Sequence, residues 1–114
     1  EFEPEMIGKA LSDGKIVVLD FTADWCMTCK YNKFRLWDRS NTIKLLKNPK
    51  IYAMRADLTI FDPDKQRLMH SMGVHGIPFN VIYSPVTKSG EVLSTAPSYQ
   101  ELKSSLVKAG LRSE

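Results

Sequence analysis

Cys26 and Cys29 are the residues whose type and spacing are best suited to chemistry in this 114-residue chain. The apolar run Ile16–Phe21, broken only by Asp20, precedes them and predicts a strand buried on both faces. A segment of helical composition follows, so the first sulfur lies among the free N–H groups of a helix N-terminus, where the helix dipole favours a thiolate. The second sulfur lies one turn later and can close a short disulfide with the first. The spacing therefore indicates a pair that attacks a disulfide, forms a mixed intermediate and resolves it internally.

Length and composition limit what surrounds this pair. The chain is long enough for one domain with one hydrophobic core, and its 43% apolar and 25% charged residues are ordinary for a soluble globular protein. The two cysteines both lie in the motif, which leaves none for a scaffold of structural disulfides. No apolar stretch is long enough for a membrane span, so we expect no direct membrane insertion by this segment. The chain begins without Met, and we expect it to be a piece of a longer protein.

Charge is unevenly distributed around a mild net charge of +3. Between positions 30 and 50, seven lysines and arginines face a single acidic residue, Asp38. No aromatic interleaving or nucleic-acid motif accompanies these cations, so a solvated helix face explains them better than a nucleic-acid site. We expect no nucleic-acid partner.

The string Phe21–Lys30 (FTADWCMTCK), together with Gly76-Ile77-Pro78-Phe79, resembles the thioredoxin-like proteins, and most closely the C-terminal periplasmic domain of the DsbD family of thiol:disulfide interchange proteins. The resemblance covers roughly Pro4 to Ala109 in element order. It implies a thioredoxin fold of the α/β class, with a central mixed sheet flanked by helices. Of the strand that precedes the first helix in that fold, only Glu1-Phe2 remains here, so this first strand is expected to be shortened or missing.

Local patterns predict the elements between these motifs. Ser40 or Asn41 is expected to cap one helix, and Asp62-Pro63 starts another. Ser98 and Glu101 form a capping box for the last helix. In the active-site helix, spacing predicts that Met27, Tyr31, Phe34 and Trp37 face the core. The predicted helices are Pro4–Leu11, 27–38, Thr42–Lys47, Pro63–Met72 and Tyr99–Ala109, and the predicted strands are 16–22, Ile51–Leu58, Phe79–Tyr83 and Glu91–Ser94.

Three residues are expected to carry the chemistry. Cys26, partly exposed at the helix end, is the candidate nucleophile, and Cys29 is the resolving thiol. Asp20 is a carboxylate in an apolar strand, so burial would raise its pKa and suit it to proton transfer with Cys29. A solvated Asp20 on an exposed strand face is the alternative. No cofactor and no metal are expected.

Three further residues are expected to bind the substrate. The resemblance implies that the Ile77–Pro78 bond is cis and that Pro78 packs beside the disulfide, whereas a plain turn proline would be trans. The Ile77 backbone would then offer strand-like hydrogen bonds to an extended segment. Trp25 would cover the disulfide and contact partners, with ordinary core packing as the alternative. Two departures from the family are Lys33, where an acidic residue is common, and Phe34, where thioredoxin has a helix proline.

The resemblance implies a protein-disulfide reductase that relays electrons. A membrane-embedded donor domain, of the same or a partner protein, would supply them, and oxidised periplasmic proteins would accept them. A stand-alone reductase, an oxidase or an isomerase remain open within the fold. In another class, Cys26 and Cys29 with His70 and His75 could hold zinc in an interaction module, although 40 residues separate the two pairs.

Overall fold

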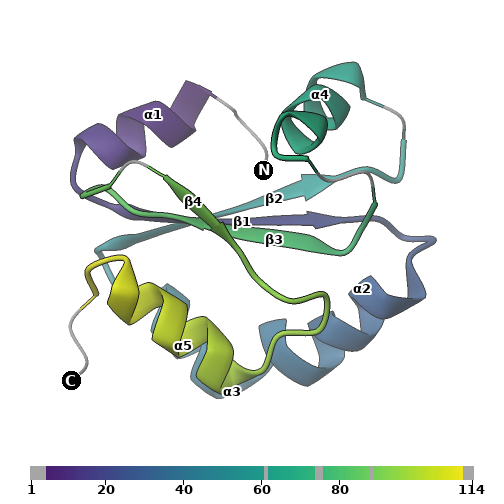
Figure 1. Cartoon of the computed structure of the whole chain (residues 1–114). Coiled ribbons are helices and arrows are strands. Elements are labelled where there is room, and N and C mark those ends of the chain that lie inside the picture. The colour runs from purple at the N-terminus through teal and green to yellow at the C-terminus, as the bar shows by residue number, and fades with distance from the viewer. Residues whose placement is uncertain (1–4, 61, 74–75, 88, 112–114) are drawn as a thin grey trace.

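The computed structural model describes residues 5–60, 62–73, 76–87 and 89–111. These residues form a four-stranded sheet with helices on both faces (Figure 1). Helices α1 and α4 cover one face, and α2, α3 and α5 cover the other. None of the helices in the described part of the chain has the length and hydropathy needed to cross a bilayer. The helices are α1 (Glu5–Ser12), α2 (Met27–Asn32), α3 (Ser40–Leu46), α4 (Pro63–Ser71) and α5 (Tyr99–Lys108), with a π-helical segment, η1 (Lys33–Trp37), after α2.

The sheet has the mixed topology that the sequence predicts. Its strand order is β2-β1-β3-β4. Strand β1 (Ile16–Thr22) runs parallel to β2 (Ile51–Asp57) and antiparallel to β3 (Phe79–Tyr83), and β4 (Gly90–Val92) pairs antiparallel with β3. Glu1-Phe2, where a first strand was expected to be shortened or missing, lies outside the described residues.

The core has two parts, one on each face of β1. Val18 packs with Leu102 and Leu106 of α5 on one face, whereas Leu19 and Phe21 belong with Met69 of α4 to a second apolar cluster. Because consecutive side chains of a strand point to opposite faces, a strand buried on both sides must be apolar throughout. This explains the apolar run Ile16–Phe21, which only Asp20 interrupts.

The predicted helix caps are confirmed in part. The Asp62 carboxylate accepts from the Asp64 N–H at 3.0 Å, and Ser98 Oγ accepts from the Glu101 N–H at 3.0 Å. The reciprocal half of the Ser98 capping box is absent, because the Glu101 carboxylate instead accepts from the N–H and hydroxyl of Ser94, at 2.8 and 2.7 Å. The cap expected at Ser40 or Asn41 is wrong. Helix α3 begins at Ser40, and its N-cap is Arg39, with no side-chain cap bond.

The active-site helix differs most from its prediction. It ends as an α-helix at Asn32 and continues as the π-helical η1. Met27, Tyr31 and Phe34, predicted to face the core, are 76%, 55% and 73% exposed; only Trp37 is buried as predicted. The inward face instead carries Cys29, Asn32, Leu36 and Trp37. The helix has two faces with apolar spacing, and the wider turn of η1 brings Leu36 and Trp37 inward together while Phe34 stays outside.

Candidate active site

Strand register brings the cysteine loop and the proline loop to the same end of the sheet. Phe21 lies opposite Phe79 across the antiparallel β1–β3 pair, and their ring centroids are 5.3 Å apart. Strand β1 leads from Phe21 into Cys26, and Pro78 immediately precedes Phe79. Since the two strands run in opposite directions, the chain leaving β1 and the chain entering β3 meet at the same end of the sheet.

Cys26 and Cys29 form a disulfide at the start of α2, with a Cα–Cα distance of 5.2 Å. Cys26 is the N-cap residue, and its Sγ accepts from the Cys29 N–H at 3.1 Å. The predicted position at a helix N-terminus is confirmed. The partial exposure predicted for Cys26 is wrong for this oxidised state: the residue is only 7% exposed, because both cysteines pack in the apolar cluster at the end of β1.

The proline loop adjoins this cluster. The Ile77–Pro78 peptide bond is cis, as the family resemblance implied. Ile77 is partly buried and packs against the same apolar cluster that contains Cys26 and Cys29. The structure thus gathers the cysteine pair and the proline loop, while the part of these residues in substrate binding remains a prediction.

Trp25 lies on the surface directly before Cys26. It is 64% exposed, which rules out the alternative of ordinary core packing. A large aromatic side chain that is left exposed beside a reactive disulfide can cover it or contact another molecule.

Asp20 is buried, so the alternative of a solvated strand face is wrong. It is 9% exposed and lines a cavity of about 230 Å³ with Val18, Trp37 and Leu46. Burial raises the pKa of the Asp20 carboxyl to about 6, although the positive charge and hydrogen bond of Arg55 lower the pKa in part. The Arg55 Nε–H donates to Asp20 Oδ2 at 3.3 Å. The raised pKa that the sequence predicted is confirmed.

Arg55 and Asn80 are polar neighbours of Asp20 that sequence reasoning missed. Both lie beside Asp20 in the sheet, Arg55 on β2 and Asn80 on β3. Directly paired residues share a face, so the three form a polar row across three strands. Asn80 is 1% exposed, and neither its amide nitrogen nor its amide oxygen has a hydrogen-bond partner among the described residues. Its polar side chain in the apolar run Phe79–Tyr83 was the available signal, but only the register places it beside Asp20.

Lys33, one of the two departures from the family pattern, is an exposed cation. Its ammonium group pairs with the Asp38 carboxylate at 2.8 Å. The positive charge of Lys33 is therefore partly neutralised by the carboxylate that directly follows η1.

The zinc alternative has no assembled site in the described part of the chain. No group of three or more potential metal-ligating side chains occurs among the described residues. Cys26 and Cys29 are bonded to each other, so they offer no thiolate to a metal in this state. His70 is an exposed residue of α4, and His75 lies outside the described residues.

Comparison with known proteins matches the geometry. A sequence profile of the thioredoxin-like family covers residues 4–85. The thiol:disulfide interchange protein DsbD of Vibrio cholerae is 33% identical over 73 residues, which are 63% of this chain and 12% of DsbD. DsbD of Pseudomonas fluorescens is 29% identical over 72 residues, with the same coverage of 63% and 12%. The chain thus spans only a small part of these curated relatives.

Solved structures share the fold. The oxidised C-terminal domain of Neisseria meningitidis DsbD superposes with a TM-score of 0.71 and 21% identity, covering 94% of this chain and 96% of that one. A thioredoxin from Thermus thermophilus gives a TM-score of 0.73 and 22% identity, covering 94% and 85%. The fold is therefore the thioredoxin fold, as predicted.

The raised pKa of Asp20 predicts a specific pH dependence of stability. The unfolded carboxyl titrates near 3.8 and the folded one near 6, so the native state binds more protons between these values. The free energy of unfolding should therefore fall by about 3 kcal/mol as pH rises through this window, and then level off. Asp20→Asn, which resembles the protonated acid, should abolish this fall. Urea titrations from pH 4 to 7.5 measure it.

The matched control is Asp57→Asn. The pKa of Asp57 is lowered by hydrogen bonds from Thr59, so its contribution has the opposite sign. This variant should lower the unfolding free energy at neutral pH. Parallel pH profiles for wild type and Asp20→Asn would contradict the assignment to Asp20.

The unpartnered amide of Asn80 predicts a second effect on Asp20. Directly opposed side chains lie close enough for one water to bridge the Asn80 amide N–H to an ionised Asp20 carboxylate. Asn80→Leu should therefore raise the pKa of Asp20 further, since the ionised form loses a donor. Carboxyl ¹³C NMR titration of labelled protein reads the pKa directly. An unchanged or lower pKa would show that the amide does not serve this carboxyl, whatever the variant does to stability.

Proposed function

The chain belongs to the thioredoxin-like family, and we propose that it is a protein-disulfide reductase that relays electrons through Cys26 and Cys29. Its class, thiol–disulfide oxidoreductase, follows from the family, the fold and the Cys-x-x-Cys pair. The observation that carries the proposal is the disulfide at the start of α2, in an apolar cluster against which Ile77 of the proline loop packs.

In the reduced protein, the Cys26 thiolate attacks one sulfur of a partner's disulfide. A mixed disulfide forms, and the partner's other sulfur leaves as a thiolate. Cys29 then loses its proton and attacks the Cys26 sulfur, which releases the partner's second thiolate. The partner gains two electrons, and the chain is left with the Cys26–Cys29 disulfide. The hydrogen bond from the Cys29 N–H to the Cys26 sulfur supports Cys26 as nucleophile, because the same donor would stabilise a thiolate.

Asp20 accepts the proton that Cys29 must lose, through water. With a pKa of about 6, its carboxyl is mostly ionised at neutral pH but close enough to that pH to exchange protons readily. Its place on β1, the strand that leads into the cysteine pair, supports this role. Arg55 holds the carboxylate and limits the rise of its pKa.

Trp25 and the Ile77–Pro78 loop form the substrate surface. The Ile77 backbone would pair with an extended segment of the partner on either side of its cysteine. Trp25 would add an aromatic contact to the partner, since its side chain is exposed and it directly precedes Cys26.

The relatives suggest the place of this reaction. By resemblance to DsbD, residues 1–114 would work as one thioredoxin-like domain of a longer, membrane-anchored protein, on the periplasmic side. A membrane-embedded domain of the same or a partner protein would reduce Cys26–Cys29, and the domain would then reduce oxidised periplasmic proteins. The identity to two DsbD proteins, each of which is much longer than this chain, supports this assignment.

The equilibrium reduction potential of Cys26–Cys29 tests the direction of electron flow. We expect a value at or below roughly −220 mV, in the range of reducing thioredoxin-like proteins. Thiol redox buffers, with tryptophan fluorescence and mass as readouts, would measure it. A value near about −120 mV would overturn the reductase and make the domain an oxidant or isomerase.

Cys29→Ser is the control for this measurement, because it leaves a single thiol and abolishes the intramolecular couple. If wild type also lacked a reversible two-electron couple, the redox proposal itself would fail. Stoichiometric zinc and metal-dependent folding would then be assayed to test the interaction module.

A further inference from the structure

The outer face of the active-site helix carries three large apolar side chains that the fold does not use. Met27, Tyr31 and Phe34, here called the α2 stripe, are 76%, 55% and 73% exposed. Their spacing places them on one side of the helix, and the stripe begins between the two cysteines. The inward face is supplied by other residues, Cys29, Asn32 and Leu36. Exposed apolar residues that gather on one face mark interaction sites more often than isolated ones do.

One member of the α2 stripe is held in place before anything binds. The Arg35 guanidinium lies 5.3 Å from the centre of the Tyr31 ring. The same guanidinium donates to the carbonyl oxygens of Ala96 and Pro97, at 3.0 and 2.8 Å. These bonds fasten the arginine to the segment before α5, so the ring above it has a fixed support. A side chain that is already ordered loses less entropy when a partner covers it.

The charge beside the α2 stripe indicates the chemistry of what covers it. Residues 27–37 contain three cations, Lys30, Lys33 and Arg35, and no acidic residue. Lys30 is exposed one turn before Phe34. The nearest carboxylates along the chain are Asp24, which lies before the helix, and Asp38, which is paired with Lys33. A surface that combines apolar and basic groups is complementary to apolar groups bordered by carboxylates.

We infer that the α2 stripe docks an apolar, acidic segment of the protein whose disulfide Cys26 attacks. This inference rests on the proposed function. The α2 stripe is continuous with the reacting sulfurs, because its first residue, Met27, directly follows Cys26. A protein whose disulfide is attacked by Cys26 therefore already lies against Met27, and we take that protein as the occupant of the stripe. Phe34 lies about 12 Å along the helix from Cys26, at 1.5 Å per residue. An extended chain covers that distance in about four residues, so the partner's apolar residue stands about four positions from its cysteine.

Two synthetic peptides test this geometry. Each peptide carries one cysteine as its mixed disulfide with 5-thio-2-nitrobenzoate. The acidic, apolar peptide has phenylalanine four positions and glutamate five positions to either side of the cysteine. The other peptide has serine and lysine at those positions. Attack by reduced Cys26 on the peptide sulfur releases the coloured thiolate, and Cys29 then releases the peptide thiol. We expect wild type to react about tenfold faster with the acidic, apolar peptide than with the other. The double variant Tyr31→Ser, Phe34→Ser should lose the apolar part of this preference and keep only the part that charge supplies, measured relative to its rate with the small disulfide DTNB.

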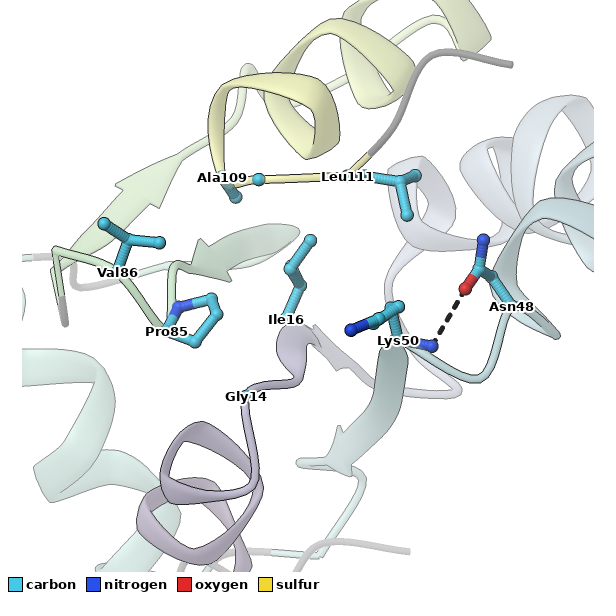
Figure 2. Close-up of a pocket in the computed structure, with 9 residues that line it drawn as sticks. Gly14, Ile16, Asn48, Lys50, Pro85, Val86, Ala109 and Leu111 are labelled. Carbon is cyan, nitrogen blue, oxygen red and sulfur yellow. Dashed lines mark hydrogen bonds between the residues drawn. The ribbon is translucent and has the colours of Figure 1, made fainter.

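Val86→Ser is the matched control. Val86 is 79% exposed and lines a cavity of about 410 Å³ together with Ile16 (Figure 2). Because Ile16 is the first residue of β1, this cavity lies at the end of the sheet opposite the disulfide. This variant should keep the wild-type preference. Lys30→Glu should reduce the preference through charge alone, and added salt should weaken the preference of wild type.

The other outcomes overturn the inference. Equal preference in wild type and the double variant would show that the α2 stripe does not contact this class of partner. A parallel loss with DTNB would assign the side chains to the chemistry or the fold. If instead Tyr31 and Phe34 were needed only for sedimentation with phosphatidylglycerol vesicles, the occupant would be a membrane. Failure of wild type to react even with DTNB would refute the proposed function, which is a different result from any of these.

Discussion

The pairing of Phe21 with Phe79 is the constraint on which the site depends. It fixes where the chain leaves β1 toward Cys26 and where it enters β3 after Pro78, so the two loops meet at one end of the sheet. A slip of one residue would turn every side chain of β3 to the opposite face. Both faces of β3 are buried, with Val81 in one apolar cluster and Ile82 in the other, which fixes the register. Packing far from the sulfurs thereby sets the geometry at the sulfurs.

Strand β1 carries a buried carboxyl group, that of Asp20, without which the core would be more stable. A carboxylate buried among apolar side chains favours its neutral form, and the partly exposed Arg55 offsets this only in part. The residual imbalance is the raised pKa of Asp20. An apolar residue at this position would remove this penalty together with the proposed proton acceptor. Under the proposed mechanism, Asp20 lowers the stability of the core in return for its chemistry. The buried, unpartnered amide of Asn80 beside it is a second destabilising group, on the next strand.

Local signals in the sequence were sufficient for much of this fold. Strand β1 has its predicted bounds because its apolar run is long and sharply delimited, and α4 starts where Asp62-Pro63 predicts. The cis bond before Pro78 came only from family resemblance. Arg55 and Asn80 could not be assigned, because residues far apart in sequence become neighbours only when the register is known. The exposed residues of α2 were misassigned because Met27, Tyr31 and Phe34 share a helix face as regular as the buried one.

That ambiguity has a physical origin in the three demands placed on one short helix. Its first turn must hold Cys26 among backbone N–H groups, and its inner face must bury Cys29, Asn32 and Leu36. Its outer face must border the sulfurs, where any protein partner has to come into contact. A helix that only packed against a sheet would be polar on that side. Apolar residues occur on both faces of α2 because the inner face packs in the core and the outer face, in our proposal, contacts a partner. Lys30 and Arg35 supply the polar groups that the exposed face would otherwise lack.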